Sequence, residues 1–271
     1  FYPLRAVTAT VSMVPLFPAS NVSKKRVGGA SGFVFDVKYG SGAFMDTEDK
    51  ARELARELVA LTKKFDRKSV AAITSMEQPL GEWVGNTAEV CEAIEVLSGR
   101  GPADTRELCA ALCGLMLEVA GIAKDREEGA ELAKKALDDG RALAKFGEVI
   151  TAQGGDAEVL RRPLEILPRA KKIFEIKSDA DGVLSELRAR PVGEALRALG
   201  GGRMKLDDKI DHAAAIRLKA KTGDAVRKGG TVMELHYNDE AKLAEALKYL
   251  DGCWKVSETA EKPKLIADYI Y

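Results

Sequence analysis

Two runs of branched and aromatic residues, each followed by a helical pattern, constrain the fold of this chain more than any other feature. Residues 31–37 (SGFVFDV) and 68–76 (KSVAAITSM) have the length and composition of buried strands. Residues 47–65 and 86–99 have the spacing of apolar positions that is typical of amphipathic helices. This strand–helix–strand–helix order predicts an α/β fold with a mainly parallel sheet flanked by helices.

Terminal residues support both helices. Thr47 precedes two acidic residues and is expected to be the first N-cap, while Asn86 is expected to cap the second helix and Gly99 to end it. Residues 105–123 and 126–155 predict at least two more helices, the second of them long.

The pattern changes after residues 154–168, which contain two glycines and two prolines. Residues 170–178 then predict a strand, and residues 191–199 a short helix. Residues 213–237 predict two strands joined through turns at Gly223-Asp224 and Gly229-Gly230. A C-terminal α+β unit is therefore expected.

Charge and hydropathy exclude two classes of partner. The 271 residues include 42 Lys+Arg and 42 Asp+Glu, so a net charge of zero gives no general attraction to nucleic acid or to a membrane surface. No stretch reaches the roughly 20 apolar residues that span a bilayer. The start of the chain is interrupted by Pro, Arg, Ser and Thr, unlike a signal peptide, and it does not begin with Met.

The four cysteines indicate a reducing compartment. Cys91, Cys109, Cys113 and Cys253 form no CxxC pair, and the chain has only two histidines, so a zinc site is not favoured. Buried free thiols in the cytoplasm are the expected arrangement, with Cys109 and Cys113 on one face of a helix.

The loop that follows the first predicted strand, DVKYGSGAFM at residues 36–45, lies where ligands collect in open α/β sheets. Its Gly40-Ser41-Gly42 stretch lacks the spacing of GxGxxG and the ending of a P-loop. Two interpretations stay open: a tight turn that needs glycine for its backbone, or a loop that shapes a pocket.

Residues upstream offer donors for a planar ligand. Arg5 has a fixed fork of N–H groups, and Ser20 and Lys24 are four apart, on one face of a helix. Such a trio suits a pyrimidine base, with two carbonyl oxygens and an N–H between them, and Phe44 could lie against its ring. The alternative is that Lys24 and the adjacent Lys25 are simply solvated.

Longer motifs give a family resemblance. Residues 1–25, 36–45 and 76–102 closely resemble the thymidine and pyrimidine-nucleoside phosphorylase family, and the likeness extends through LGGGR (199–203) to residues 223–239. The resemblance implies a homodimeric pentosyltransferase with phosphate as co-substrate and no required cofactor. It cleaves thymidine or uridine to the base and a pentose 1-phosphate, and the sequence does not indicate which nucleoside is preferred.

The resemblance also implies roles for particular residues. Arg5, Ser20 and Lys24 would bind the base, with Arg5 and Lys24 as catalytic residues, and Phe44 would line the base pocket. Donors on a base carbonyl stabilise the negative charge that develops as the glycosidic bond breaks. The family has an Asp after the arginine, where this chain has Ala6, so the support that such an Asp gives Arg5 is missing.

A second implied site binds a monovalent cation. Glu92 matches the family glutamate, and Leu80 and Trp83 would supply main-chain carbonyls. The alternative is that Glu92 is an ordinary residue on the helix surface.

The phosphate site is expected to lie elsewhere. The Lys-x-Ser stretch and the HTGGTxDKLE-like motif of the family do not occur in these 271 residues, so no phosphate-binding residues are assigned here. A truncated, impaired enzyme is expected, with residues 1–28 as a remnant helix of the small domain, 29–168 as the α/β domain and 169–271 as the C-terminal domain.

Two alternatives from other classes stay open. One is a non-catalytic scaffold or base-binding domain derived from the enzyme. The other is a carrier module, because GDAVRKGGTVMEL resembles the hammerhead of biotinyl and lipoyl domains, although no attachment lysine in an MKM or DKA sequence is present.

Overall fold

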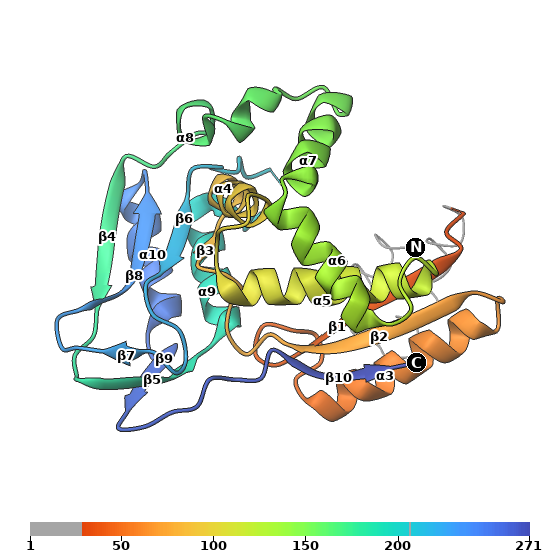
Figure 1. Cartoon of the computed structure of the whole chain (residues 1–271). Helices are drawn as coiled ribbons and strands as arrows, with labels where there is room; N and C mark the ends of the chain where they lie inside the picture. The colour runs from red at the N-terminus through yellow and green to blue at the C-terminus, as the bar shows by residue number, and fades with distance from the viewer. Residues whose placement is uncertain (1–28, 206) are drawn as a thin grey trace. The chain divides into compact units, whose positions relative to one another are not determined.

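A computed structural model describes residues 29–205 and 207–271 of the chain (Figure 1). These residues form two compact units. The first unit comprises residues 29–76, 108–133 and 264–271, and the second comprises the described residues of 77–107 and 134–263. The expected remnant helix at 1–28 lies outside the described residues, and the three-domain division with boundaries at 28 and 168 stays a prediction.

The first unit is built on a mixed sheet. Among the described residues, β1 (Gly32–Tyr39) and β2 (Lys68–Ser75) pair in parallel, from Gly32 opposite Lys68 to Tyr39 opposite Ser75. The third strand, β10 (Ile266–Ile270), pairs antiparallel with β2. Both strands expected from the sequence are confirmed, and so is the parallel pairing between them. The antiparallel third strand comes from the C-terminal end of the chain.

Helices cover both faces of this sheet (Figure 1). On one face, Leu54 and Leu58 of α3 (Glu48–Lys63) are buried with alternate residues of β1. On the other face, Leu115 of α5 (Ala103–Val119) is buried against β2. Gly32 of β1 allows close approach here, because a Cβ at this position would lie 2.5 Å from Val119 Cγ1. The expected α/β class is therefore confirmed.

Glycines also set the packing of the helices that follow. Gly114 of α5 packs on α6 (Arg126–Asp138) beside Gly129. The long helix expected over residues 126–155 is instead two helices, because Gly140 adopts a left-handed conformation (φ +81°) before α7 (Arg141–Ala152).

The second unit contains two antiparallel sheets within its described part. One has the order β3-β6-β8-β4 and the other β7-β5-β9, and together they form the expected α+β structure. Residues 213–237 contain three strands rather than two. The bounds are β3 (Trp83–Val84), β4 (Lys172–Lys177), β5 (Gly182–Leu187), β6 (Ala215–Leu218), β7 (Ala225–Val226), β8 (Thr231–Tyr237) and β9 (Trp254–Ser257).

Helices pack around these sheets and complete the core of the second unit. The buried side chains of β5, β6 and β8 share one cluster with those of α9 and α10. The helix expected at 191–199 is confirmed as α9, and a π-helical turn (Arg197–Gly201) follows it. The bounds are α4 (Asn86–Leu97), η1 (Ala157–Leu160), α8 (Pro163–Ile166), α9 (Ala189–Leu196) and α10 (Glu240–Leu250).

One expected cap is confirmed and one is wrong. The Thr47 hydroxyl accepts a hydrogen bond from Lys50 N, as expected of the N-cap of α3. Gly85, not Asn86, is the N-cap of α4. A Cβ on Gly85 would lie 2.6 Å from Ala214 O, so β6 passes too close for any other residue, and the Asn86 side chain donates instead to Gly201 O. Gly99 follows the end of α4 with φ +78°, as expected.

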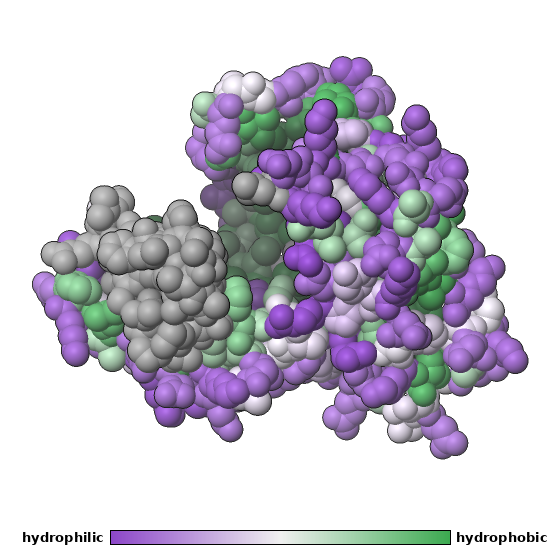
Figure 2. Space-filling view, turned by 180° about the vertical axis from the view of Figure 1, so that it is seen from behind, coloured by the Kyte–Doolittle hydropathy of each residue, from purple (hydrophilic) through white to green (hydrophobic). Residues whose placement is uncertain are grey.

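Hydrophilic residues cover most of the face seen in Figure 2, with smaller hydrophobic areas between them. Within the described residues, no helix is both long enough and apolar enough to cross a membrane. All four cysteines lie in the described part and are free thiols. The expectation that they are buried holds for Cys253 alone, because Cys91 is half-buried and Cys109 and Cys113 are exposed on α5.

The α5–α6 contact predicts a strong effect of a single methyl group. A Cβ on Gly114 would overlap the Arg126 carbonyl oxygen and lie 2.8 Å from Ala130 N, both of which are backbone atoms that cannot rotate away. Gly114→Ala is expected to lower the free energy of unfolding by about 1–3 kcal/mol, measured by urea denaturation.

The same substitution in open space is the control. A Cβ on Gly193 of α9 meets nothing within 4 Å. Gly193→Ala is expected to raise stability by about 0.5–1 kcal/mol, because alanine loses less backbone entropy in a helix. Equal effects of the two substitutions would contradict the packing of Gly114 described here.

Candidate functional site

The loop after β1 is held by its own backbone. Gly40 N donates to Met45 O and Ala43 N donates to Gly40 O, each over 3.0 Å. Gly42 N donates to Met76 O, also over 3.0 Å, which ties the loop to the residue after β2. Gly40 has φ +109°, so this position requires glycine. The tight-turn interpretation is thus confirmed for Gly40, and a tight turn is compatible with a loop that also shapes a pocket.

Phe44 lies at the outer part of this loop, with 64% of its side chain exposed. An aromatic side chain of this size can pack against the face of a planar ligand. The residues expected to complete the base site, Arg5, Ser20 and Lys24, lie outside the described residues. Their arrangement around Phe44 therefore stays a prediction.

A polar cluster lies beside the loop at the carboxyl ends of β1 and β2. Lys38 Nζ is 2.9 Å from Asp36 Oδ2 and donates to Thr74 Oγ1 over 3.1 Å. The Thr74 hydroxyl is buried and donates to Asp36 Oδ1. The two charges neutralise each other, and each of the three side chains orients the others. The sequence places Asp36 and Lys38 at a strand end, but it gives no signal that Thr74 of β2 joins them.

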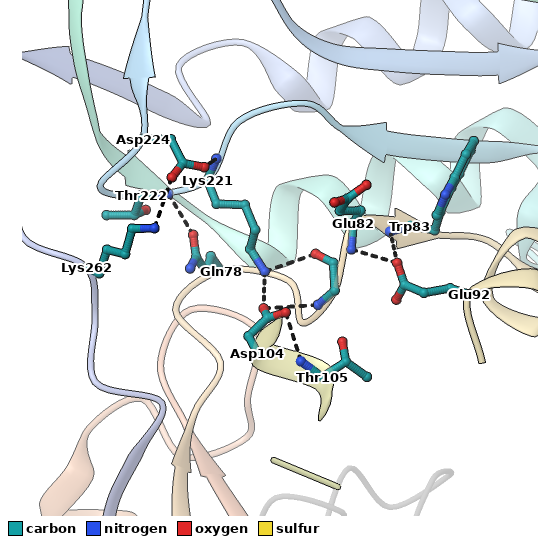
Figure 3. Close-up of polar contacts among 11 residues, drawn as sticks. Gln78, Glu82, Trp83, Glu92, Asp104, Thr105, Lys221, Thr222, Asp224 and Lys262 are labelled. Carbon is teal, nitrogen blue, oxygen red and sulfur yellow. Dashed lines mark hydrogen bonds and ion pairs between the residues drawn. The ribbon is translucent and has the colours of Figure 1, made fainter. Parts of the chain in front are cut away.

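Glu92 of α4 is bonded to the backbone of the loop that precedes its helix (Figure 3). Its Oε2 accepts hydrogen bonds from Glu82 N at 2.8 Å and Trp83 N at 3.0 Å. Burial raises the pKa of the Glu92 carboxyl, the two N–H groups oppose that rise, and the nearby Asp104 and Glu82 carboxylates add to it. The interpretation of Glu92 as an ordinary surface residue is therefore wrong.

A second carboxylate holds the same loop (Figure 3). Asp104, at the start of α5, forms an ion pair with Lys221 and accepts from Gly81 N at 3.2 Å. Lys221 Nζ also donates to Gly81 O at 2.9 Å. Both charged side chains are mostly buried, with 17% of Lys221 and 29% of Asp104 exposed. One ion pair thus fixes both the N–H and the C=O of Gly81.

Further bonds extend this network toward the turn between β6 and β7. Thr222 N donates to Gln78 Oε1 at 2.9 Å, and Lys221 N donates to Asp224 Oδ2 at 3.0 Å. Asp224 in turn lies 3.3 Å from Lys262 Nζ. The loop over residues 78–83 is therefore held from α4, from α5 and from the C-terminal β structure. These contacts all lie within the second unit.

Gly81 is required by this arrangement. Its backbone has φ +72°, and a Cβ would overlap Glu92 Oε1 and lie 2.8 Å from Glu92 Cδ. A side chain here would push the Glu92 carboxylate away from Glu82 N and Trp83 N.

The oxygen atoms near Glu92 are of the kind that bind a hard cation. A carboxylate with one oxygen not engaged by Glu82 N and Trp83 N lies beside the loop that carries the Leu80 carbonyl. No group of three or more His, Cys, Asp and Glu side chains in the described part of the chain could hold a metal ion. Main-chain carbonyls would therefore have to supply the other ligands, and Lys221 already occupies Gly81 O.

Comparison with known protein families gives two matches. Residues 1–143 match the family described as glycosyl transferase family, a/b domain. Residues 183–257 match the pyrimidine nucleoside phosphorylase C-terminal domain. The two matches cover both described units in part.

Three curated relatives resemble almost the whole chain. The pyrimidine-nucleoside phosphorylase of Geobacillus stearothermophilus is 42% identical over 270 residues, which are 99% of this chain and 62% of that protein. Those of Staphylococcus haemolyticus and Bacillus subtilis are 40% and 39% identical over 265 residues, 98% of this chain and 61% of theirs. The chain thus spans a little over three fifths of the length of these relatives.

The raised pKa of Glu92 predicts a pH-dependent contribution to stability. The folded chain holds the Glu92 proton more tightly than the unfolded chain, so the free energy of unfolding falls as pH rises just above the ordinary value of 4.5. Glu92→Gln removes this titration. As the pH rises from 4 to 7, the urea midpoint of the wild type is expected to fall relative to that of Glu92→Gln.

The control for this titration is Glu107→Gln, which changes an exposed glutamate of α5. Its urea midpoint is expected to follow that of the wild type over the same pH range. A wild type that gains stability relative to Glu92→Gln as pH rises would contradict the assignment.

Proposed function

This chain belongs to the pyrimidine-nucleoside phosphorylase family, and on that basis we propose that it recognises the base in the phosphorolysis of pyrimidine nucleosides. The observation that carries the proposal is the continuous match over 98–99% of the chain, at 39–42% identity, to proteins of that name. The position of the Gly40–Met45 loop at the carboxyl ends of parallel strands supports it, because ligands of α/β sheets bind there.

In the proposed reaction, a phosphate oxygen attacks C1′ of the nucleoside. The C1′–N1 bond breaks, its electron pair stays on N1 of the base, and the base then takes a proton. The products are the free pyrimidine and a pentose 1-phosphate. The barrier falls if donors meet the negative charge that appears on the base as the bond breaks.

We assign those donors to Arg5, Ser20 and Lys24. The guanidinium of Arg5 and the ammonium of Lys24 would donate to the carbonyl oxygens that gain charge, and act as catalytic groups. Ser20 would fix the orientation of the base. Phe44 would lie against the ring, which its exposure on the fixed loop supports.

Phosphate is the co-substrate, and its binding residues are not assigned within these 271 residues. Neither family motif for phosphate occurs in the sequence, so this polypeptide assayed alone is expected to be impaired or inactive. The same observation favours a second candidate, a non-catalytic base-binding or scaffold domain. A homodimer and a cytoplasmic location, supported by the four free thiols, complete the proposal.

Glu92 and Leu80 would hold a monovalent cation in this proposal. The oxygen donors beside Glu92 suit such an ion, and its charge would stabilise the ionised form of a carboxylate that burial disfavours. The ion would hold the 78–83 loop, and we assign it no chemical step.

A chimaeric enzyme tests the proposed reaction. The part of the Geobacillus relative that the match does not cover is fused to this chain, and phosphorolysis of thymidine and uridine is followed by ultraviolet absorbance. The chimaera is expected to turn over in excess phosphate, whereas the 271-residue chain shows little or no turnover. A folded chimaera without turnover would favour the scaffold alternative. Rapid turnover by the 271-residue chain alone would refute the prediction that it lacks the residues that bind phosphate.

Matched arginine variants of the chimaera test the assigned base contact. Arg5→Gln is expected to lower kcat about 10²–10³-fold, the usual loss when one donor to a developing charge is removed. Arg26→Gln removes the same charge from the same segment and is expected to leave kcat within a few-fold. Equal losses would show that Arg5 has no specific role.

Thermal unfolding tests the cation without reference to activity. Potassium chloride is expected to raise the Tm of the chain above that in choline chloride at equal ionic strength, because binding to the folded state alone stabilises it. The difference is expected to vanish in Glu92→Gln. If potassium still raises the Tm of this variant, Glu92 does not bind the ion.

A further inference from the structure

The outer face of the β3-β6-β8-β4 sheet carries side chains that the proposed function does not use. The register places Trp83 opposite Arg217, Arg217 opposite Glu234, and Ala215 opposite His236. Because side chains alternate along a strand, these residues share one face of the sheet. The intervening residues of β6 and β8 point into the hydrophobic core.

A pocket of about 390 Å³ lies over this face, within the second unit. Its volume is in the range of about 300–1,000 Å³ that is usual for small-molecule sites. The side chains of α4 form one wall, and the segment over residues 163–170 forms another. Much of the lining is apolar, including Pro102, Leu164, Leu167 and Pro168.

Arg217 brings an unused donor to this pocket. Its guanidinium lies over the Trp83 ring, 5.2 Å from the ring centre, and one terminal nitrogen reaches Glu82 Oε2 at 3.4 Å. Its Nε is buried and has no hydrogen-bond partner among the described residues. The Nε has no access to solvent, but 35% of the Arg217 side chain is exposed and the residue lines the pocket, so the rest of its guanidinium can meet an acceptor there.

His236 adds a second unused polar atom. Its Nε2 is buried without a hydrogen-bond partner in the described structure and lies 3.6 Å from Glu234 Oε2. The imidazole ring is tilted against Trp83, with 5.0 Å between the ring centres. Trp83, His236 and Arg217 therefore bring aromatic surface and a cationic side chain to the lining of one pocket.

Two of the acidic side chains in the lining are paired with arginines. Glu95 accepts from Arg100 at 2.7 and 3.2 Å, and Glu82 lies 3.4 Å from Arg217. Glu92 Oε2 accepts two backbone N–H groups. Arg169 also lines the pocket, and its charge acts on Cys91 and His236, which line it too. Two arginines thus bring positive charge to the pocket.

We propose that this pocket binds a small aromatic carboxylate, whose carboxylate accepts from the guanidinium groups of Arg217 and Arg169 and whose ring packs against Trp83 and the apolar wall. A planar ring with one anionic end matches both the aromatic and apolar surface and the two arginines of the lining. The inference does not rest on the proposed function, because it assigns neither base binding nor a catalytic step to this pocket.

Titration with benzoate tests the proposal in the whole chain. The chain has two tryptophans, so the two indole N–H signals in an NMR spectrum report on Trp83 in the pocket and on Trp254 of β9, which does not line it. Benzoate is expected to shift the Trp83 signal in a saturable way and to leave the Trp254 signal in place. Benzamide, which has the same ring without the charge, is expected to bind at least tenfold more weakly.

Matched arginine variants locate the charge contact. Arg169→Gln is expected to weaken benzoate binding about tenfold, whereas Arg161→Gln, which changes an arginine 81% exposed in the same segment, leaves it unchanged. An unmoved Trp254 signal shows that each variant is folded. The proposal is overturned if benzoate leaves Trp83 unaffected, if benzamide binds as well, or if the two variants behave alike.

Discussion

The ion pair between Asp104 and Lys221 holds the loop over residues 78–83, which joins three parts of the second unit. Two mostly buried charges would be costly apart, and together they bind both the N–H and the C=O of Gly81. Glu92 binds the next two N–H groups along the same loop. The loop is thereby fixed between α4, α5 and the turn after β6. Leu80, which is expected to bind a cation with Glu92, lies on this loop.

In the first unit, backbone hydrogen bonds hold the loop that follows β1. The Gly40–Met45 loop forms hydrogen bonds within itself and to Met76, and it carries the exposed Phe44. In the neighbouring Asp36–Lys38–Thr74 cluster, the positive charge of Lys38 is paired with the negative charge of Asp36. A loop held by backbone hydrogen bonds limits the entropy lost when a planar ligand is bound.

Much of the fold follows from local sequence patterns, and the site follows from them only in part. The strands β1 and β2 and the helix α3 could be predicted because their periodicity and composition are local properties. The contact of Asp104 with Lys221 spans 117 positions, and nothing in either sequence neighbourhood indicates the other. The expectation that Asn86 caps α4 is wrong because it, too, depends on a contact between distant parts of the chain. Asparagine is generally a better N-cap than glycine, but β6 passes so close to residue 85 that only glycine fits there, and Gly85 is the N-cap. Sequence motifs predict that Arg5, Ser20 and Lys24 bind the base, and this stays a prediction because the three residues lie outside the described part of the chain.

The central claim, that this chain recognises a pyrimidine base, is tested most directly by calorimetric titration with uracil and thymine. Lys24→Met and Lys25→Met give a matched pair, because they remove the same charge at adjacent positions. The account predicts that the wild type and Lys25→Met bind a base with similar affinity, and that Lys24→Met binds at least tenfold more weakly. A folded wild type that binds neither base, or equal affinities for the two variants, would contradict it.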